Sequence, residues 1–477
     1  MSDEACLCSP CPYNPLRSGE RVTLGTGTFV SFLTQRHLFP EWRARRFPYK
    51  IVRRKNMNVE QFDEQLRAIP AGGVTSAAGF RAAGVHAGFR KSPDRDDLAL
   101  VVADEPCPAA GVFTKNRFCA APVTVSREHL GNKGYGMVRA VIANSGNANA
   151  ATGEPGLEAA RYTSEVAAQL LGCETDQVLV ASTGVIGVQL DVEHFETGIP
   201  RALAALSRDG GAAVAQAIMT TDTHPKEYAV TYESGDLAYV GCNFTVGGCV
   251  KGSGMIMPNM ATMIAIITTD APVAPEALHA LLSDSVNRTF NKVTVDSDTS
   301  TNDTCIMLAS GAAAAGAAPI VEGTEAYLEL EHALYVVCEA LARGIAADGE
   351  GASKLVTVNV SGAATPEDAD TCARSVANSP LVKTAIAGHD CNWGRIAAAL
   401  GKCGVAFDQR AVDIDIMELP VCRAGLAVPF DEDEALRRFE APEIVISVDL
   451  GAGSCATTVW TCDLTHDYIS INADYRS

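Results

Sequence analysis

The 477-residue sequence lacks long apolar runs, an excess of basic residues and internal repeats. No stretch approaches the roughly 20 consecutive apolar residues that span a bilayer, and its beginning lacks the basic-then-apolar order of a secretory signal. Lysine and arginine number 38 against 57 acidic residues, and the net charge of −19 repels nucleic acids and anionic membranes. These features predict a cytoplasmic protein that binds neither membranes nor nucleic acids.

Nucleotide-binding signatures are also missing. The chain has neither the Walker spacing, in which Gly-Lys-Ser/Thr ends a phosphate loop, nor the Rossmann glycine fingerprint. Hydrophobic residues make up 47% and charged residues 20%, as in ordinary globular proteins, which excludes a disordered or fibrous chain. The sequence signals no metal and no organic cofactor, and its length predicts about two to four domains.

Cysteine, by contrast, is abundant. The 16 cysteines occur singly in apolar stretches such as those around Cys338 and Cys455. A chain of this length does not need a disulfide framework to fold, so we expect buried free thiols.

The first 56 residues differ in composition from the rest. They hold ten basic and four acidic residues, a charge of +6, which leaves 28 − 53 = −25 for the remainder. Two explanations are open: a poorly ordered extension, or a mis-assigned start with translation beginning at Met57. Cys6, Cys8 and Cys11 would need a fourth ligand to form a metal site, and a nucleic-acid arm would work against the acidic body.

Strand and helix patterns alternate after residue 72, which is typical of a mixed α/β protein. Strands are predicted at residues 98–102, 138–142, 178–180 and 355–360. Helices are predicted at residues 156–171, 275–288 and 324–346. A glycine-rich corner at residues 348–351 follows the last helix. We therefore divide the chain beyond the extension into an α/β domain at residues 57–352 and a smaller C-terminal α/β domain at residues 353–477.

Residues 251–270 carry the most chemistry. Glycines and a proline constrain the backbone before Thr262, and a run typical of a buried strand follows it. A hydroxyl held at this junction could attack the carbonyl of Ala261 and shift the acyl group from nitrogen to oxygen. Hydrolysis of that ester would split the chain. The new N-terminal threonine would carry a nucleophilic hydroxyl and its own base, an α-amino group with a pKa of about 8.

These residues alone leave a second interpretation open. Glycine-rich turns before strands are common, and a threonine at the start of a strand usually serves only the strand. A phosphate loop is disfavoured because Lys251 precedes the glycines instead of following them.

Residues 251–270 closely resemble the self-cleaving glutamate N-acetyltransferases, also called ornithine acetyltransferases, of arginine biosynthesis. The resemblance covers about residues 72–477, and further motifs fit the same family in the same order. They are residues 72–75 (GGVT), 79–80 (GF), 113–117 (FTKNR), 144–149 (NSGNAN), 182–187 (STGVIG), 294–304, 348–351 (DGEG), 379–384 (SPLVKT), 392–395 (NWGR) and 471–475 (INADY). Taken together, these motifs are specific to the family.

The resemblance implies cleavage between Ala261 and Thr262, which gives associated chains 1–261 and 262–477. Thr262 is then the nucleophile of a ping-pong cycle that takes acetyl from N2-acetylornithine, releases ornithine and acetylates glutamate. Thr183 and Gly184 match the oxyanion-hole pair, a hydroxyl and a backbone N–H that stabilise the tetrahedral intermediates. From the sequence alone, this pair would be interpreted as a simple turn.

The resemblance also implies the substrate-binding residues. They are Thr220, Lys251, Thr262, Glu350, Asn472 and Ser477. Lys251 suits a carboxylate and Glu350 suits an ammonium group. Without the resemblance, both would be interpreted as solvated surface charges, and Asn472 and Ser477 as an ordinary tail. The substrate-binding threonine could be any of those in residues 220–223. The segment 224–248 is longer than usual for the family, so the match of residues 220–223 to the family motif is not fixed.

The resemblance further implies a layered α/β sandwich with a smaller C-terminal α/β domain, and a heterotetramer of two alpha and two beta chains. It requires no cofactor, although acetyl-CoA could serve as a second acetyl donor. Two other functions stay open: a self-cleaving aminopeptidase or amidohydrolase, in which water takes the acyl group, and a binding protein without turnover. Lys251 and Glu350 favour transfer, because a peptidase would not need this pair of charges.

Overall fold

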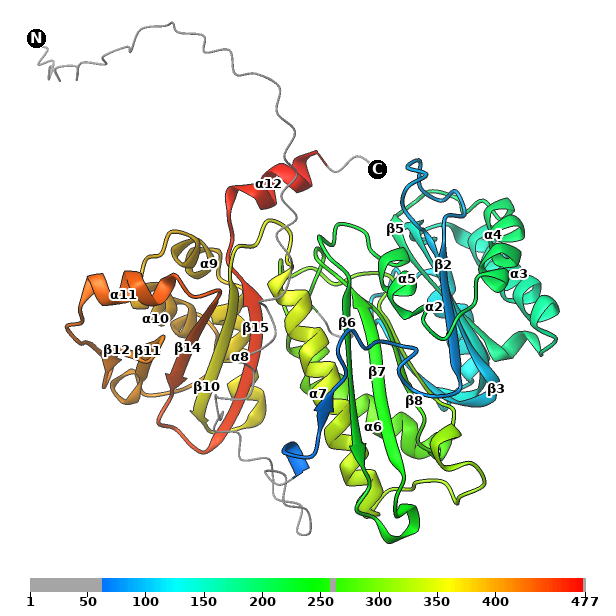
Figure 1. Ribbon diagram of the computed structural model, residues 1–477. Helices are drawn as coiled ribbons and strands as arrows, with labels where there is room; N and C mark the ends of the chain where they lie inside the picture. The colour runs from blue at the N-terminus through cyan, green and yellow to red at the C-terminus, as the bar shows by residue number, and fades with distance from the viewer. Residues whose placement is uncertain (1–61, 258–262, 475–477) are drawn as a thin grey trace, which may run out of the picture. The chain divides into compact units, whose positions relative to one another are not determined.

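The computed structural model describes residues 62–257 and 263–474, which lie in one compact unit of the chain. Four predicted features lie outside these ranges: the extension 1–56, Ala261, Thr262 and Ser477. Two β-sheets and eleven α-helices make up the described part, which confirms the predicted mixed α/β class (Figure 1). None of these helices is long and apolar enough to cross a membrane.

The first sheet has nine strands in the order β1-β6-β7-β8-β9-β3-β4-β5, with β2 paired to β3. Its strands are β1 (Arg67–Ala68), β2 (Phe80–Val85), β3 (Leu98–Phe113), β4 (Tyr135–Asn147), β5 (Val178–Val185), β6 (Lys226–Glu233), β7 (Asn243–Lys251), β8 (Ile264–Thr269) and β9 (Thr304–Ala309). Most neighbours are antiparallel, but β4 with β5 and β8 with β9 are parallel. The sheet is therefore mixed.

The long strand β3 divides this sheet into two halves. Its residues 98–103 pair with β2 and its residues 109–113 pair with β9, while β4 pairs with residues 98–102 and 107–110 on its other edge. The register shifts between Val102 and Cys107, and a bulge of this kind bends a strand. Apolar side chains from both halves share one core, for example Val101 of β3 and Ile266 of β8. The two halves thus pack face to face.

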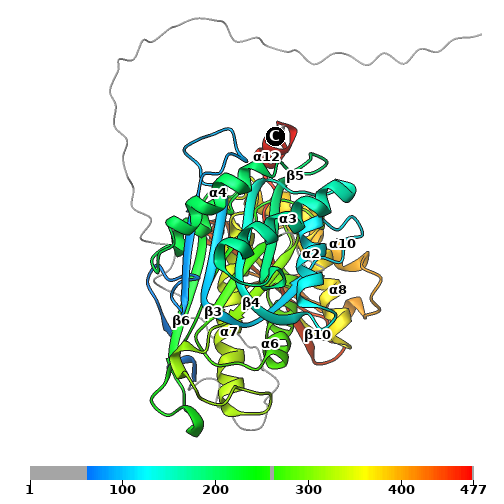
Figure 2. The ribbon, with the colours of Figure 1, turned by 90° about the vertical axis from the view of Figure 1, so that its right-hand side faces the viewer.

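Helices cover the outer faces of both halves. The helices of this part are α2 (Ala121–Leu130), α3 (Gly153–Leu171), α4 (Glu193–Ala204), α5 (Gly211–Ala217), α6 (Pro275–Arg288) and α7 (Glu325–Ala347). Leu281 of α6 and Leu334 of α7 pack with Ile267 of β8, while Ile199 of α4 packs with Ile142 of β4. Figure 2 shows α3 and α4 in front of the strands. The result is the layered α/β sandwich that the family resemblance implies.

The second sheet has six strands in the order β13-β12-β11-β14-β10-β15. Its strands are β10 (Leu355–Ala363), β11 (Asp413–Ile416), β12 (Leu419–Arg423), β13 (Leu426–Ala427), β14 (Glu443–Asp449) and β15 (Cys455–Cys462). The remaining helices are α8 (Pro366–Ala377), α9 (Pro380–Ala387), α10 (Trp393–Gly401), α11 (Glu432–Phe439) and α12 (His466–Ala473). Trp460 of β15 joins the core around α7, so α7 packs against both sheets. The boundary at residues 352 and 353 stays a prediction.

The predicted helices are confirmed. α6 has the predicted bounds, and α7 begins directly after its N-cap Thr324, whose side chain accepts a hydrogen bond from the N–H of Tyr327. α3 begins at Gly153, three residues earlier than predicted, because glutamate and proline are both tolerated in a first helical turn. The 13 cysteines of the described ranges are all free, and eight of them are buried, as expected.

Candidate active site

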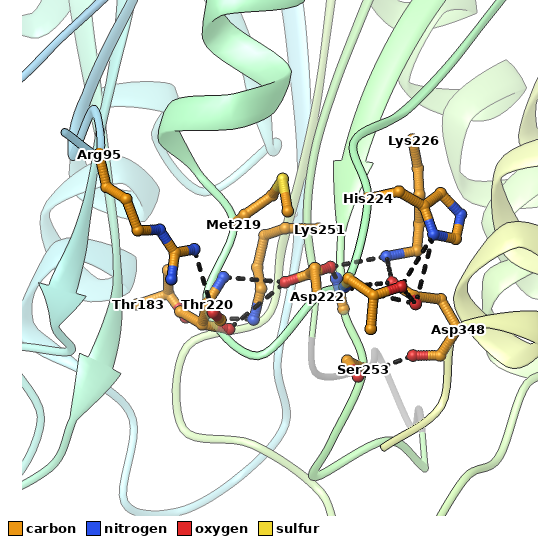
Figure 3. A network of polar contacts seen from close by, with 12 residues as sticks. Arg95, Thr183, Met219, Thr220, Asp222, His224, Lys226, Lys251, Ser253 and Asp348 are labelled. Atoms are coloured by element: carbon orange, nitrogen blue, oxygen red, sulfur yellow. Dashed lines mark hydrogen bonds and ion pairs between the residues drawn. The ribbon is translucent and has the colours of Figure 1, made fainter. Parts of the chain in front are cut away.

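The β7–β8 pair positions the lysine of the predicted substrate site. Lys251 is the last residue of β7 and pairs with Ile264, the first residue of β8. Lys251 is only 4% exposed, and its Nζ lies 3.4 Å from Oγ1 of Thr183 near the end of β5 (Figure 3). The interpretation of Lys251 as a solvated surface charge is therefore wrong.

Gly184 holds an unusual backbone conformation beside Thr183. Its φ angle is +134°, in a region that favours glycine. A Cβ atom at this position would lie 2.3 Å from the carbonyl carbon of Gly146 in the neighbouring strand β4. Both observations require glycine here. The buried Thr183 hydroxyl and the adjacent N–H thus belong to a rigid strand end.

A buried ion network lies beside this lysine (Figure 3). Nζ of Lys226, the first residue of β6, lies 2.7 Å from a carboxylate oxygen of Asp222 and also contacts the carboxylate of Asp348. Asp222 accepts hydrogen bonds from the backbone N–H of Gly252 at 2.6 Å and of Thr220 at 2.9 Å. The three charged side chains are at most 3% exposed, so their charges are compensated within the network.

Neighbouring charges shift the pKa values in this network. Burial alone would raise the pKa of Asp222, but the charges of Lys226 and Lys251 hold it well below its usual range. Burial likewise opposes the lowered pKa of Asp348, which results from its contacts with His224 and Lys226. Burial lowers the pKa of Lys251, and the charge of Asp222 partly offsets this effect. Both aspartates are therefore ionised at neutral pH.

Glu350 lies at the glycine-rich corner after α7. It is 9% exposed, so the surface-charge interpretation is wrong here too. Its backbone N–H donates to the carbonyl of Ser253 at 3.0 Å, and its carboxylate accepts a 2.8 Å hydrogen bond from Nδ2 of Asn472 in α12. A Cβ atom on Gly254 would lie 2.4 Å from both carboxylate oxygens, so glycine leaves the space that Glu350 occupies. The fold thus brings Glu350 and Asn472 together.

The threonines of residues 220–223 join the network at different places. The N–H of Thr220 donates to Asp222, and its carbonyl accepts a 3.4 Å hydrogen bond from Arg95. Thr223 instead donates its N–H and its hydroxyl to Asp348. The choice of Thr220 as the substrate-binding threonine stays a prediction.

Met263 is the described residue that follows the predicted nucleophile. Its N–H donates to Oδ1 of Asp303 at 3.0 Å, and its carbonyl accepts from the N–H of Thr304 at 2.9 Å. Asp303 is buried and contributes to the electrostatic environment of Lys251.

Sequence reasoning missed four charged residues that the fold places around the predicted site. They are Asp222, Lys226, Asp303 and Asp348. Asp222, Asp303 and Asp348 lie within residues 220–223, 294–304 and 348–351, which the family resemblance singles out, whereas nothing in the sequence marks Lys226. Within residues 62–257 and 263–474, no group of three or more histidine, cysteine, aspartate or glutamate side chains is placed to hold a metal ion.

The arrangement suits small molecules that carry both charges. A buried ammonium group at Lys251 and a buried carboxylate at Glu350 offer one partner to each sign of charge, and charge-assisted hydrogen bonds are the strong ones. The hydroxyl of Thr183, near the end of β5, lies next to the lysine side chain, where it can donate a hydrogen bond to a developing oxyanion. Fold and site together are those of an α/β enzyme.

Comparison with known proteins gives the family. The ArgJ family model matches residues 81–477. The arginine biosynthesis bifunctional protein ArgJ of Symbiobacterium thermophilum is 49% identical over 408 residues, which cover 85% of this chain and 99% of the relative. The protein of the same name from Thermosynechococcus vestitus is 46% identical over 421 residues, with 85% and 98% covered. The chain belongs to the ArgJ family.

Two solved structures are also similar to the chain. The crystal structure of arginine biosynthesis bifunctional protein argJ from Bacillus halodurans is 42% identical and covers 44% of this chain and 97% of its own, with a TM-score of 0.42. Ornithine acetyltransferase from Mycobacterium tuberculosis, solved with ornithine, is also 42% identical and covers 41% of this chain and 98% of its own, with a TM-score of 0.37.

Proposed function

We propose that the protein transfers an acetyl group from N2-acetylornithine to glutamate, giving ornithine and N-acetylglutamate. The observation that carries the proposal is the pair of buried, opposite charges at Lys251 and Glu350 in a chain of the ArgJ family. Relatives that cover 85% of the chain are named arginine biosynthesis bifunctional proteins. The substrates of this reaction are amino acids whose extra charges need partners of this kind.

The proposed nucleophile is Thr262, freed by cleavage of the bond after Ala261. The hydroxyl attacks the Ala261 carbonyl, the acyl group moves from nitrogen to oxygen, and water hydrolyses the ester. The α-amino group of Thr262 then acts as the base for its own hydroxyl. Asp303 supports this geometry because it holds the N–H of Met263, the next residue along the chain, at 3.0 Å.

The proposed cycle is ping-pong. The hydroxyl of Thr262 takes the acetyl group, ornithine leaves, and the amine of glutamate attacks the acetyl-enzyme. Each half passes through a tetrahedral oxyanion, which we assign to the hydroxyl of Thr183 and the N–H of Gly184. The nearby ammonium of Lys251, 3.4 Å from that hydroxyl, adds positive charge where negative charge develops.

Substrate binding is proposed for residues around this centre. Lys251 holds the α-carboxylate of the donor, and Glu350 holds its side-chain ammonium group. The remaining binding residues are Thr220, Asn472 and Ser477. The hydrogen bond between Asn472 and Glu350 supports this set because it orients the carboxylate.

A second acetyl donor is proposed because the relatives are named bifunctional. Acetyl-CoA would acylate Thr262 in place of N2-acetylornithine, and no cofactor would be needed. We further propose a cytoplasmic heterotetramer of two 1–261 and two 262–477 chains.

The test combines mass measurement with an acetyl-transfer assay. We expect purified protein to contain fragments 1–261 and 262–477, and Thr262→Ala to give one uncut, inactive chain. Thr262→Ser is the matched control, because it keeps a hydroxyl and should still be cleaved. An uncut but active enzyme would refute the nucleophile assignment. Release of acetate alone, without transfer to glutamate, would favour the hydrolase, and repeating the assay with acetyl-CoA tests the second donor.

A further inference from the structure

Lys226 is a buried charge that the proposed chemistry does not use. It opens β6, its side chain is 3% exposed, and its ammonium group bridges the carboxylates of Asp222 and Asp348 (Figure 3). Burying a lysine is unfavourable unless its partners compensate the charge. The two carboxylates belong to segments far apart in the sequence, so the bridge joins two separate parts of the site.

One end of the bridge holds the backbone next to Lys251. One oxygen of Asp222 accepts from the N–H of Gly252 at 2.6 Å, while the other accepts from the N–H of Thr220 at 2.9 Å. Gly252 directly follows Lys251, so this carboxylate fixes the backbone at the end of β7. The position of Lys251 therefore depends on Asp222, and that of Asp222 depends on Lys226.

The other end holds the corner that bears Glu350. Asp348, at the end of α7, contacts Lys226 through its carboxylate, and its backbone carbonyl accepts from Oγ of Ser253 at 2.7 Å. The carbonyl of Ser253 in turn accepts from the N–H of Glu350 at 3.0 Å. The bridge thus ties the strand end that carries Lys251 to the corner that carries Glu350.

We propose that Lys226 is a positioning residue that sets the chain length of the amino-acid donor. This inference rests on the proposed function, in which Lys251 binds the carboxylate and Glu350 binds the side-chain ammonium of N2-acetylornithine. The carbon chain of the substrate separates those two charges, so a fixed spacing between Lys251 and Glu350 selects one length. Lys226 contacts neither substrate charge and acts through Asp222 and Asp348.

Loss of the bridging charge should loosen this spacing. In Lys226→Met, the carboxylates of Asp222 and Asp348 remain buried without their shared cation. Like charges in one buried site repel, and either the two segments separate or one carboxylate takes up a proton. Separation of the segments, or a proton on Asp222, weakens the hydrogen bond that this carboxylate accepts from the N–H of Gly252. In Lys226→Arg the positive charge and several donors remain, so the bridge should largely survive.

The experiment compares N2-acetylornithine with N2-acetyllysine, which is one methylene longer, as acetyl donors to glutamate. A misfit of one methylene changes kcat/KM by about 10- to 200-fold, so we expect the cleaved wild-type enzyme to prefer acetylornithine by a ratio in this range. Lys226→Met should raise KM for acetylornithine and shrink the ratio roughly tenfold. Lys226→Arg should keep most of the wild-type ratio.

Lys292→Met is the matched control, because it removes an ion pair to Asp370 at 2.6 Å outside the site. If Lys226→Met lowers the melting temperature but keeps the wild-type ratio of kcat/KM for the two donors, the role of Lys226 is purely stabilising and the inference is overturned. If wild-type enzyme does not transfer acetyl from acetylornithine, the proposed function fails instead. The affinities of the enzyme for ornithine and for lysine, measured by calorimetry, then test the spacing between Lys251 and Glu350 directly. If wild type and Lys226→Met have the same ratio of the two affinities, the inference about Lys226 is overturned.

Discussion

Replacing Gly254 by alanine should weaken binding of the amino-acid donor without unfolding the protein. The added Cβ would lie 2.4 Å from the carboxylate oxygens of Glu350, whereas ordinary contact begins near 3.4 Å. The carboxylate must therefore retreat by 3.4 − 2.4 = 1.0 Å. A retreat of this size breaks its 2.8 Å hydrogen bond to Asn472 and moves it away from the proposed ammonium site.

A hydrogen bond to a charged group contributes about 1.5–3 kcal/mol of free energy. Loss of that amount from substrate binding corresponds to a rise of about 10- to 150-fold in KM for N2-acetylornithine. The melting temperature should change little, because the displaced atoms are the end of a flexible side chain. Steady-state kinetics on the cleaved Gly254→Ala enzyme measure the effect. Gly388→Ala is the control, since its Cβ would meet only an ordinary 3.5 Å contact with the Thr384 carbonyl. A wild-type KM in Gly254→Ala would refute the role given to Glu350.

Gly184→Ala should destabilise the protein by at least about 1 kcal/mol and abolish transfer, because it strains a φ of +134° and meets the backbone of Gly146. Gly187→Ala, with φ of +82° and open space, should be milder in thermal melts; equal losses would contradict the clash. Burial raises the pKa of Glu227 from 4.5 to about 7. Its stabilising contribution is therefore complete below pH 4.5 and lost as the pH rises through 7. Glu227→Gln should remove this component from melting curves recorded across that range, and an unchanged pH dependence would exclude it.

Local patterns predicted three of the eleven α-helices of the described ranges with nearly correct bounds, but one strand poorly. α6 starts at Pro275 because proline suits the first helical position, and its apolar residues keep helical spacing. The sequence predicts β3 only for residues 98–102, where the apolar β-branched run lies, and prolines such as Pro106 and Pro108 are normally absent from the middle of a sheet. The strand continues through a bulge to Phe113 because its far end pairs with β9. That partner lies far away in the sequence, so no local signal reveals it.

The candidate site shows the same division. Thr183, Lys251, Glu350 and Asn472 were named from motifs, and the fold places Lys251 3.4 Å from Thr183 and Asn472 2.8 Å from Glu350. Lys226 could not be found in this way, because a lysine that opens a strand normally lies in water. Its importance depends on Asp348, a carboxylate 122 residues away in the sequence that only the tertiary fold brings to the Lys226–Asp222 pair.

The order of residues was sufficient for the α/β class, the main helices, the free thiols and the motifs that carry the chemistry. These features depend on local propensity, hydrophobic period and residue type, which are properties of neighbours along the chain. Folding in three dimensions was needed for the bent sheet, for the burial of Lys251 and Glu350, and for the bridge at Lys226. Burial and charge compensation depend on which distant segments pack together, and short sequence patterns do not indicate which segments these are.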